Sequence, residues 1–294
     1  MDLSKLLEQR EQQKNGMNAE EYAQWKKQER EQIWESIDQT TEKICGDEKN
    51  LQRFFDFQSR HKPCRISNQI LLYSQNDKLT DVRTFDDWKK AGRSVKKGEP
   101  GYSFLIRREY RRKDGSIGES SNVVKAYDVL QTSGRQMESL PSQSLERLLA
   151  ALIQNSPADI VIDSTISEKT TAIYHPDTNC IHIRNVPSAK EAIFALARET
   201  AHSEYAKMPD YARERFAVQA YCATYLFAKR NGMDVSNFQF GSVSENLRNL
   251  DNTQKRLFLS DVKNGAGAIN QLVKQFEKEH MRNEKQKSSG QERG

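Results

Sequence analysis

The chain has 294 residues, a length that predicts about two domains. Only 36% of the residues are hydrophobic, 30% are charged, and the first residues lack the apolar core of a signal peptide. With no run of about 18 apolar residues to span a bilayer, we expect a cytoplasmic protein with no membrane partner. The net charge of +5 is unevenly placed: −4 over residues 1–52, +8 over 53–125 and +1 over 126–294.

The first half of the chain predicts helices that lead into a small sheet. Residues 1–40 are rich in Gln, Glu and Lys, with few apolar anchors, and we expect an exposed helical N-terminal extension that packs weakly. Apolar residues then recur at helical spacing up to about Arg60, which predicts one or two amphipathic helices. SNQILLYSQ (67–75) predicts a buried helix capped by Ser67, and FDDWKKAG (85–92) a short helix that ends at Gly92.

From residue 98 the period changes from helix to strand. A Gly-Glu-Pro-Gly turn precedes a strand in which Tyr102, Phe104 and Ile106 share one face. KDGS (113–116) predicts a hairpin turn, and VVKAYDVLQT (123–132) supplies the returning strand. We therefore expect a domain over residues 41–135, followed by a polar linker at 133–144.

The second half predicts a mostly helical domain over residues 145–280 with a short sheet. SQSLERLLAALIQ (142–154) reads as a helix, and strands are expected at 159–163, 171–175 and 180–184. Ser188 with Glu191 forms a capping box that opens the next helix, and a further helix over 213–230 ends at Gly232. Residues 281–294 are expected to form a disordered tail. The fold class predicted for the whole chain is α+β.

The basic stretch carries the first candidate site. Five cations surround Trp88, namely Lys89, Lys90, Arg93, Lys96 and Lys97. The aromatic residues Tyr102 and Phe104 follow on the predicted strand, and Tyr73 and Gln75 lie on the preceding predicted helix. Cations that follow a phosphate chain, interleaved with aromatic faces on which bases stack, are the requirements of single-strand binding. The alternative is that the aromatic residues are core and the lysines only solubilise the domain.

The second candidate site is Arg198-Glu199-Thr200-Ala201-His202. A zinc peptidase helix reads His-Glu-x-x-His, in which both histidines bind the metal and the glutamate polarises water. Arg198 stands at the first ligand position, and an arginine cannot give up its proton to become a ligand. We therefore expect no catalytic residue and no metal, with Glu199 and His202 as residual candidates. Under the alternative of an active zinc site, His175, His182 or Glu214 would supply further ligands.

Three stretches resemble the N-terminal domain of the antirestriction protein ArdC family: RFFDFQSRHKPCRISNQILLYSQN, TFDDWKKAGRSVKKGEPGYSFL and KDGSIGESSNVVKAYDVLQT. The matching residues include Asn68, Gln75, the G-R-S-V-K-K-G-E turn at 92–99, and the D-V-x-Q-T strand that ends in Gln131 and Thr132. The resemblance implies a single-stranded DNA-binding domain encoded by plasmids and other mobile elements, followed by a zincin-like metallopeptidase domain. TAIYHPDTNCIHIR and the helix at 188–206 resemble that second domain, with Arg198 as a departure from its active pattern.

The basic stretch and the altered metal motif predict a non-enzymatic, single-stranded DNA-binding accessory protein, and the resemblance implies that it protects transferred DNA during conjugation. Its partners would be single-stranded DNA and other mobile-element proteins, with no cofactor. The predicted DNA-binding residues are Asn68, Tyr73, Gln75, Trp88, Lys89, Lys90, Arg93, Lys96, Lys97, Tyr102, Gln131 and Thr132. Two alternatives remain: a zinc-dependent peptidase that uses Glu199 and His202, and a non-catalytic scaffold for protein partners.

Overall fold

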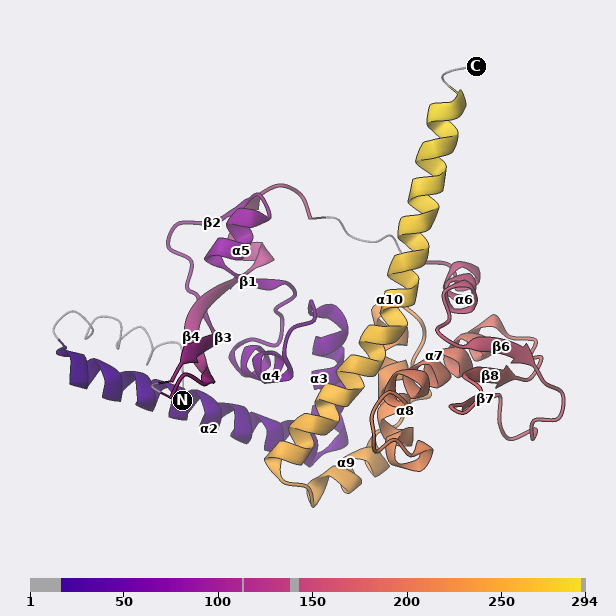
Figure 1. Ribbon diagram of the computed structural model, residues 1–294, viewed down its shortest axis with the longest axis horizontal. Coiled ribbons are helices and arrows are strands. Elements are labelled where there is room, and N and C mark those ends of the chain that lie inside the picture. Colours follow the sequence, from indigo (N-terminus) through magenta and orange to yellow (C-terminus); the bar gives the residue numbers. More distant parts are fainter. Residues whose placement is uncertain (1–16, 113, 138–142, 292–294) are drawn as a thin grey trace. The chain divides into compact units, whose positions relative to one another are not determined.

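The computed structural model of the chain describes residues 17–112, 114–137 and 143–291 (Figure 1). The chain divides into two compact units: unit 1 comprises residues 1–139 and 239–256, and unit 2 comprises residues 140–238 and 257–294. Both units combine helices with small sheets, which confirms the predicted α+β class. The predicted second domain at 145–280 differs from this division, because residues 239–256 belong to unit 1.

Unit 1 is built on the long helix α2 (Ala19–Gly46), which begins with a capping box between Asn18 and Glu21. Trp25, Ile33, Ile37 and Ile44 are all buried on it at spacings that place them along one side of the helix. The expected break at residue 40 and weak packing are therefore not seen for the described part of the extension. Residues 1–16 lie outside the described residues.

Further helices of unit 1 pack against α2. Asp47 caps α3 (Glu48–Arg60), whose phenylalanines 54, 55 and 57 are fully buried. Helix α9 (Gly241–Arg248) contacts both α2 and α3, with the rings of Phe240 and Phe55 5.4 Å apart. Burial of Phe240 explains why this segment, distant in sequence, belongs to unit 1. Helix α4 (Ile66–Gln75) has Arg65 at its N-cap position, so the predicted cap at Ser67 is wrong.

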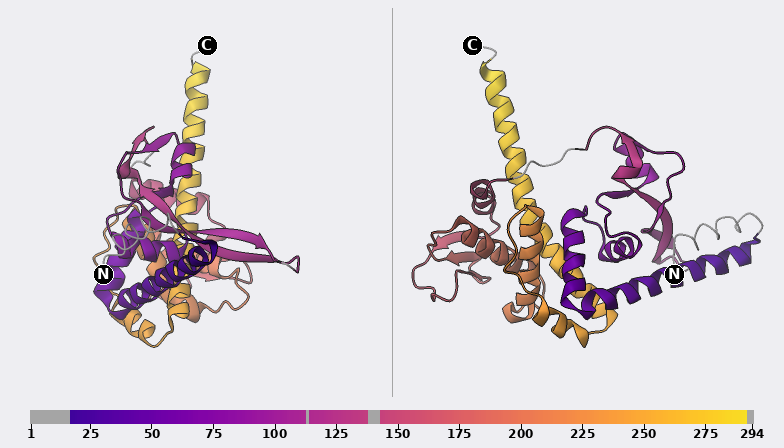
Figure 2. Two further views of the ribbon diagram at one scale, coloured as in Figure 1. Left: turned by 90° about the vertical axis from the view of Figure 1, so that its left-hand side faces the viewer. Right: turned by 180° about the vertical axis from the view of Figure 1, so that it is seen from behind.

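Two antiparallel sheets complete unit 1 (Figure 2). The larger has the order β1-β4-β3, formed by β1 (Val82–Thr84), β3 (Tyr102–Arg111) and β4 (Ile117–Asp128). The predicted hairpin is present, with Tyr102 opposite Ala126 and Gly115 at φ +84° in its turn. The smaller sheet pairs β2 (Arg93–Val95) with β5 (Thr132–Gly134), which follows the short 3-10 helix η2 (Val129–Gln131). Helix α5 (Phe85–Lys90) precedes β2, and Gly92 follows it at φ +73°, as predicted.

The outer edge of β3 is closed by two side chains of α4. The Asn68 amide donates to the carbonyl of Leu105 (2.9 Å) and accepts its N–H (2.8 Å). Gln75 makes the same pair of bonds with Ser103, at 3.1 and 2.7 Å. Each carboxamide thus replaces one peptide group of a neighbouring strand. The side chains of Ser103 and Leu105 lie on the buried face of β3.

Unit 2 places a three-stranded sheet against α7 (Ala189–Tyr205). The strands are β6 (Asp159–Ile162), β7 (Ala172–His175) and β8 (Cys180–Ile183), close to the predicted positions, in the order β6-β8-β7. Ser188 caps α7 as predicted, while Glu191 accepts from Thr171. The remaining helices are α6 (Leu145–Gln154), α8 (Arg213–Arg230) and α10 (Asn252–Gln291), whose first turn lies in unit 1.

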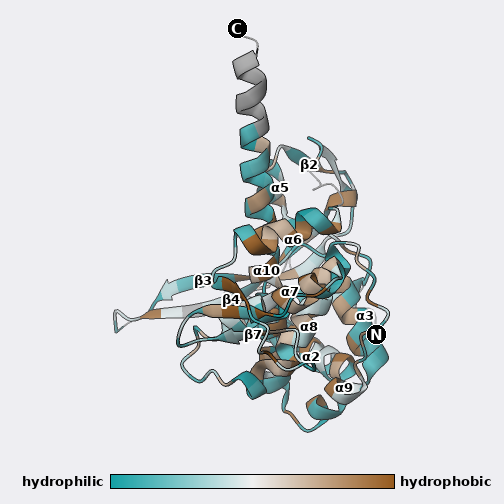
Figure 3. Cartoon of the chain, turned by 90° about the vertical axis from the view of Figure 1, so that its right-hand side faces the viewer, coloured by the Kyte–Doolittle hydropathy of each residue, from teal (hydrophilic) through white to brown (hydrophobic). Residues whose placement is uncertain are grey.

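Helix α10 continues through the region expected to be disordered, as far as Gln291. Residues 281–289 contain neither Gly nor Pro and favour helix. The coloured end of α10 nearest the C-terminus is mostly hydrophilic in Figure 3, in agreement with the exposure of residues 278–283. No helix among the described residues has the length and apolar character needed to cross a membrane.

We predict that Asn68→Ala destabilises unit 1 by about 2–4 kcal/mol, because the Leu105 N–H and C=O would be buried without partners. Urea unfolding followed by tryptophan fluorescence measures this directly, since Trp25, Trp34 and Trp88 all lie in unit 1. The control is Ser74→Ala on the exposed side of α4, expected within about 0.5 kcal/mol of wild type. Equal stabilities of the two variants would contradict the edge-closing role.

Candidate functional site

Trp88 is a core residue and not a stacking platform. Its side chain is 0% exposed, and its indole N–H donates to the carbonyl of Tyr127 at 2.8 Å. The guanidinium groups of Arg83 and Arg93 lie 4.5 and 5.9 Å from its ring centre. Because no face of the ring is open, the predicted stacking of a base on Trp88 is wrong.

Three more predicted DNA-binding residues brace the loop that follows α5. Arg93 donates through Nε to the Thr132 hydroxyl (2.7 Å) and through Nη2 to the Thr132 carbonyl (3.0 Å). Gln131 accepts the N–H of Asp128 (2.8 Å) and donates to the Pro100 carbonyl (2.7 Å). Gln131 and Thr132 are both buried. Together with Asn68 and Gln75, these side chains hold backbone in place.

Four predicted cations are exposed, and we call them the lysine cluster: Lys89, Lys90, Lys96 and Lys97. Lys96 donates to the Leu130 carbonyl (2.9 Å), and Lys90 lies 3.5 Å from a carboxylate oxygen of Asp87. Phe85 and Leu130, the exposed apolar side chains of α5 and η2, are 55% and 74% accessible. The lysine cluster is therefore open to an anionic partner.

The two predicted tyrosines are half-buried. Tyr73 packs against Phe54 and Phe57, with ring centres 5.2 and 5.4 Å away, and burial raises its pKa. The hydroxyl of Tyr102 accepts a hydrogen bond from Asn76 at 3.2 Å. Both rings are partly occupied by contacts within unit 1, so neither presents a full face to a base.

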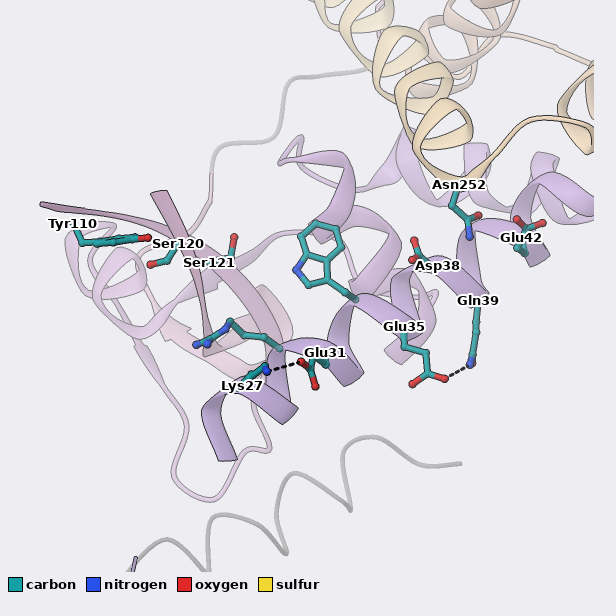
Figure 4. Close-up of a pocket in the computed structure, with 12 residues that line it drawn as sticks. Lys27, Glu31, Glu35, Asp38, Gln39, Glu42, Tyr110, Ser120, Ser121 and Asn252 are labelled. Atoms are coloured by element: carbon teal, nitrogen blue, oxygen red, sulfur yellow. Dashed lines mark hydrogen bonds and ion pairs between the residues drawn. The ribbon is translucent and has the colours of Figure 1, made fainter. Parts of the chain in front are cut away.

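Sequence reasoning missed a second surface, which we call the Trp34 groove. Two cavities of about 1030 and 290 Å³ share Trp34, Ser120 and Ser121 in their walls. Figure 4 shows Tyr110, Ser120 and Ser121 of the β3–β4 hairpin on one side and Lys27 and Glu31 of α2 on the other. Trp34 is 37% exposed, with the Arg256 guanidinium 5.8 Å from its ring centre, and Tyr110 is 48% exposed, so each ring is partly accessible.

Charge divides the Trp34 groove into two halves. One half carries four basic residues, namely Lys27, Arg30, Arg65 and Arg107, together with Glu31, which lies 3.9 Å from the Lys27 ammonium. The other half carries Glu35, Asp38 and Glu42 of α2, where Asp38 pairs with Arg256 and Glu42 with Lys255. An anionic chain is attracted to the first half and repelled by the second.

The sequence signal for this groove was present but lay inside an acidic segment. Lys27, Arg30 and Trp34 are spaced i, i+3 and i+7, which places them on one face of a helix. The net charge of −4 over residues 1–52 concealed this short basic and aromatic face. Nothing local indicated that Ser120 and Ser121 would lie opposite it.

In unit 2, the buried carboxylate of Glu199 is paired with arginine. Its carboxylate is 0% exposed and accepts two bonds from Arg213, at 2.7 and 2.8 Å. One of its oxygens also accepts the N–H of Tyr174 (2.8 Å), on the outer edge of β7. Arg198 Nε lies 3.7 Å from the other oxygen. Two guanidinium groups thus surround this carboxylate.

His202 is buried beside this ion pair. A ring nitrogen, Nδ1, lies 3.1 Å from the Tyr211 hydroxyl. Burial lowers the pKa of His202 to about 4, with Glu199 opposing and Arg213 adding to the shift. The imidazole is therefore neutral at physiological pH, and the residual motif places a neutral ring next to a fully paired carboxylate.

The donor set does not fit a divalent cation. Arg213 occupies both oxygens of Glu199, and Arg198 adds a second positive charge. Among the described residues, no group of three His, Cys, Asp or Glu side chains converges. His175 and His182, named as alternative ligands, lie with ring centres 4.7 Å apart, and His182 bonds Asp163.

Residues 23–137 match the family model described as the N-terminal domain of anti-restriction factor ArdC. This segment of the chain is therefore similar to an ArdC N-terminal domain. The match starts in α2, earlier than the boundary predicted at residue 41, and it includes both Trp34 and the lysine cluster. Both surfaces of unit 1 are therefore parts of one ArdC-type domain.

Solved structures of the antirestriction ArdC protein from the R388 plasmid are similar to the chain. The Mn(II)-bound structure is 18% identical, covers 81% of this chain and 97% of its own, and has a TM-score of 0.48. The metal-free structure is 17% identical, covers 82% and 98%, and has a TM-score of 0.49. No curated protein sequence matches the chain.

We predict that Arg213→Met destabilises unit 2 by about 3–5 kcal/mol, because it leaves the Glu199 charge buried and unpaired. The double variant Glu199→Leu/Arg213→Met should recover most of this loss. Urea unfolding followed by far-UV circular dichroism, with tryptophan fluorescence tracking unit 1, separates the two units. Arg215→Met, which breaks the exposed pair with Asp210, is the control and should cost at most about 1 kcal/mol.

The lowered pKa of His202 makes unit 2 sensitive to acid. As the pH falls below 6.5, His202 takes up a proton in the unfolded chain, but in the folded protein it does so only near pH 4. The free energy of unfolding therefore decreases between pH 6.5 and pH 4. The loss from this group approaches about 3 kcal/mol at pH 4. Asp261, whose pKa burial raises to about 6, acts in the opposite direction.

An NMR titration isolates His202 from Asp261. The imidazole C–H resonance that disappears in His202→Gln should titrate near pH 4 in the wild-type protein. Titration of that resonance at pH 6 or above would show that the ring is solvated and that the acid sensitivity has another source.

Proposed function

We propose that the ArdC-type domain binds single-stranded DNA in the basic half of the Trp34 groove. The observation that carries the proposal is that one groove combines two partly exposed aromatic rings, Trp34 and Tyr110, with four cations: Lys27, Arg30, Arg65 and Arg107. Phosphates would contact the cations while unstacked bases lie against the rings. The hydroxyls of Ser67, Ser120 and Ser121 add hydrogen-bonding groups to the same walls.

The aromatic rings favour a single strand over a duplex. In a duplex the base faces are covered by their neighbours, and only the phosphates remain available to the cations. In a single strand each base can stack on Trp34 or Tyr110, with a contribution of about 1–3 kcal/mol per base. The acidic half of α2, from Glu35 to Glu42, limits the path of the strand to the basic half.

The lysine cluster supports a second, weaker contact to phosphates. In Figures 1 and 2, α5 and β2 lie at one end of unit 1 and α2 lies at the other. The lysine cluster would therefore add a phosphate contact separate from the groove, without an open aromatic ring among the predicted residues. Trp88, Arg93, Gln131 and Thr132 would contribute by holding this loop in shape.

The match of residues 23–137 to the ArdC N-terminal domain supports a role in antirestriction. We infer that the chain is an accessory protein of a plasmid or other mobile element, and that it shields transferred single strands. Unit 2 would serve as a non-catalytic, zincin-like scaffold, because Arg213 takes up the carboxylate that would polarise water. If unit 2 is a non-catalytic scaffold, DNA binding by the chain should be independent of added zinc.

Fluorescence anisotropy with labelled ~20-mers, single-stranded and duplex, at two salt concentrations tests the proposal. Arg65→Ala/Arg107→Ala should weaken single-strand binding about tenfold or more and lower the salt slope by about 1.4. Trp34→Ala should weaken binding about fivefold or more without changing the slope, because it removes stacking and no charge.

Charge-matched double variants control for a loss of net charge. Lys43→Ala/Lys49→Ala removes two exposed cations that line neither surface, and it should leave affinity within about twofold. Lys96→Ala/Lys97→Ala tests the lysine cluster separately, and a loss below about twofold would remove that cluster from the interface. The groove assignment fails if both groove variants bind like this control.

A further inference from the structure

A cavity of about 410 Å³ lies within unit 2, along the side of α7 that carries Arg198. Its walls combine basic, hydroxyl-bearing and aromatic side chains with one carboxylate, all from α7, α8 and two neighbouring loops: Thr171, Ser188, Lys190, Glu191, Phe194, Arg198, Tyr221, Thr224, Asn237 and Phe238. The volume falls in the range of small-molecule sites. Neither the DNA-binding proposal nor the buried ion pair uses this cavity.

Arg198 brings an incompletely paired cation to the cavity. Its Nε is buried and has no hydrogen-bond acceptor among the described residues, while the side chain as a whole is 42% exposed. The carboxylate at 3.7 Å, Glu199, already accepts bonds from Arg213 and Tyr174. A buried N–H without an acceptor is unfavourable, and an anion in the cavity would provide one. Arginine also matches the planar geometry of phosphate or carboxylate oxygens.

Aromatic rings form one wall of the cavity. Phe194 and Phe238 meet edge to face with ring centres 5.6 Å apart, and Tyr221 lies 4.9 Å from Phe238. A cavity with a cation at one point and aromatic rings beside it suits an anion that carries a planar ring.

Glu191 and Lys190 define the other end of the cavity. Glu191 lies seven residues before Arg198, a rise of about 10 Å along the helix. It accepts a bond from Thr171 through one oxygen, so its second oxygen can accept a donor from a ligand. Lys190 is shared with the exposed Asp234 at 2.8 Å, which leaves Arg198 as the main cation.

We propose that this cavity binds a nucleoside monophosphate. The phosphate would lie on Arg198, the base against Phe194 and Phe238, and an exocyclic amino group of the base would donate to Glu191. The span from amino group to phosphate matches the separation of Glu191 and Arg198 along α7. The substitution that removes the first metal ligand thus also supplies the anion-binding group.

Isothermal titration calorimetry on the full chain tests the site with deoxyadenosine monophosphate, thymidine monophosphate, deoxyadenosine and inorganic phosphate as separate probes. We expect saturable binding of deoxyadenosine monophosphate with a Kd below about 1 mM, and binding at least about tenfold weaker for deoxyadenosine or phosphate alone. Thymine has no exocyclic amino group, so its nucleotide should bind about fivefold more weakly or worse. Equal binding of the two nucleotides would overturn the contact with Glu191.

Variants separate this site from the DNA interface. Arg198→Gln should weaken nucleotide binding at least about tenfold, while Arg184→Gln, which removes another arginine with a buried unpaired Nε outside the cavity, should not. Trp34→Ala should leave nucleotide binding unchanged, because Trp34 lies in unit 1. Equal loss in the two arginine variants, loss in Trp34→Ala, or no binding by any probe would overturn the proposal.

Discussion

The architecture of unit 1 depends on two carboxamides that complete the free edge of β3. A sheet edge presents peptide groups that need partners, and a buried edge without partners is costly. Asn68 and Gln75 satisfy four of these groups from a single helix, and they are seven residues apart so that both face the strand. With the edge closed, α4 is fixed beside β3, and the Trp34 groove has a rigid wall at Leu105 and Asn68.

Unit 2 uses an ionic version of the same arrangement. Glu199 on α7 accepts the outward N–H of Tyr174 on β7, so a helix side chain again takes the place of a missing strand. Here the side chain is charged, and its burial requires a counter-charge. Arg213 supplies it from the first turn of α8, which ties β7, α7 and α8 together at one carboxylate.

Local signals made much of the fold predictable from sequence, and long-range packing accounts for most of the rest. Gly92, Ser188 and Gly232 mark element ends through backbone and capping preferences that need only a few neighbouring residues. The roles of Trp88 and Gln131 stay open at the level of sequence, because an aromatic or amide side chain in a basic segment is compatible with both ligand contact and a place in the core. Burial decides between these readings, and burial of Trp88 depends on Arg83, Arg93 and Tyr127 arriving from separate elements.

The same reasoning explains why the DNA-binding site that we propose includes α2 rather than the motif itself. Residues that determine the shape of a binding loop are buried and hydrogen-bonded, so a dense motif such as G-R-S-V-K-K-G-E marks where backbone must be held. Residues that contact a flexible polymer must instead be exposed, and single exposed side chains leave only a weak pattern in sequence. Trp34 fits this description: one partly exposed ring on an otherwise polar helix face, which acquires meaning only when the hairpin carrying Tyr110 lies across from it.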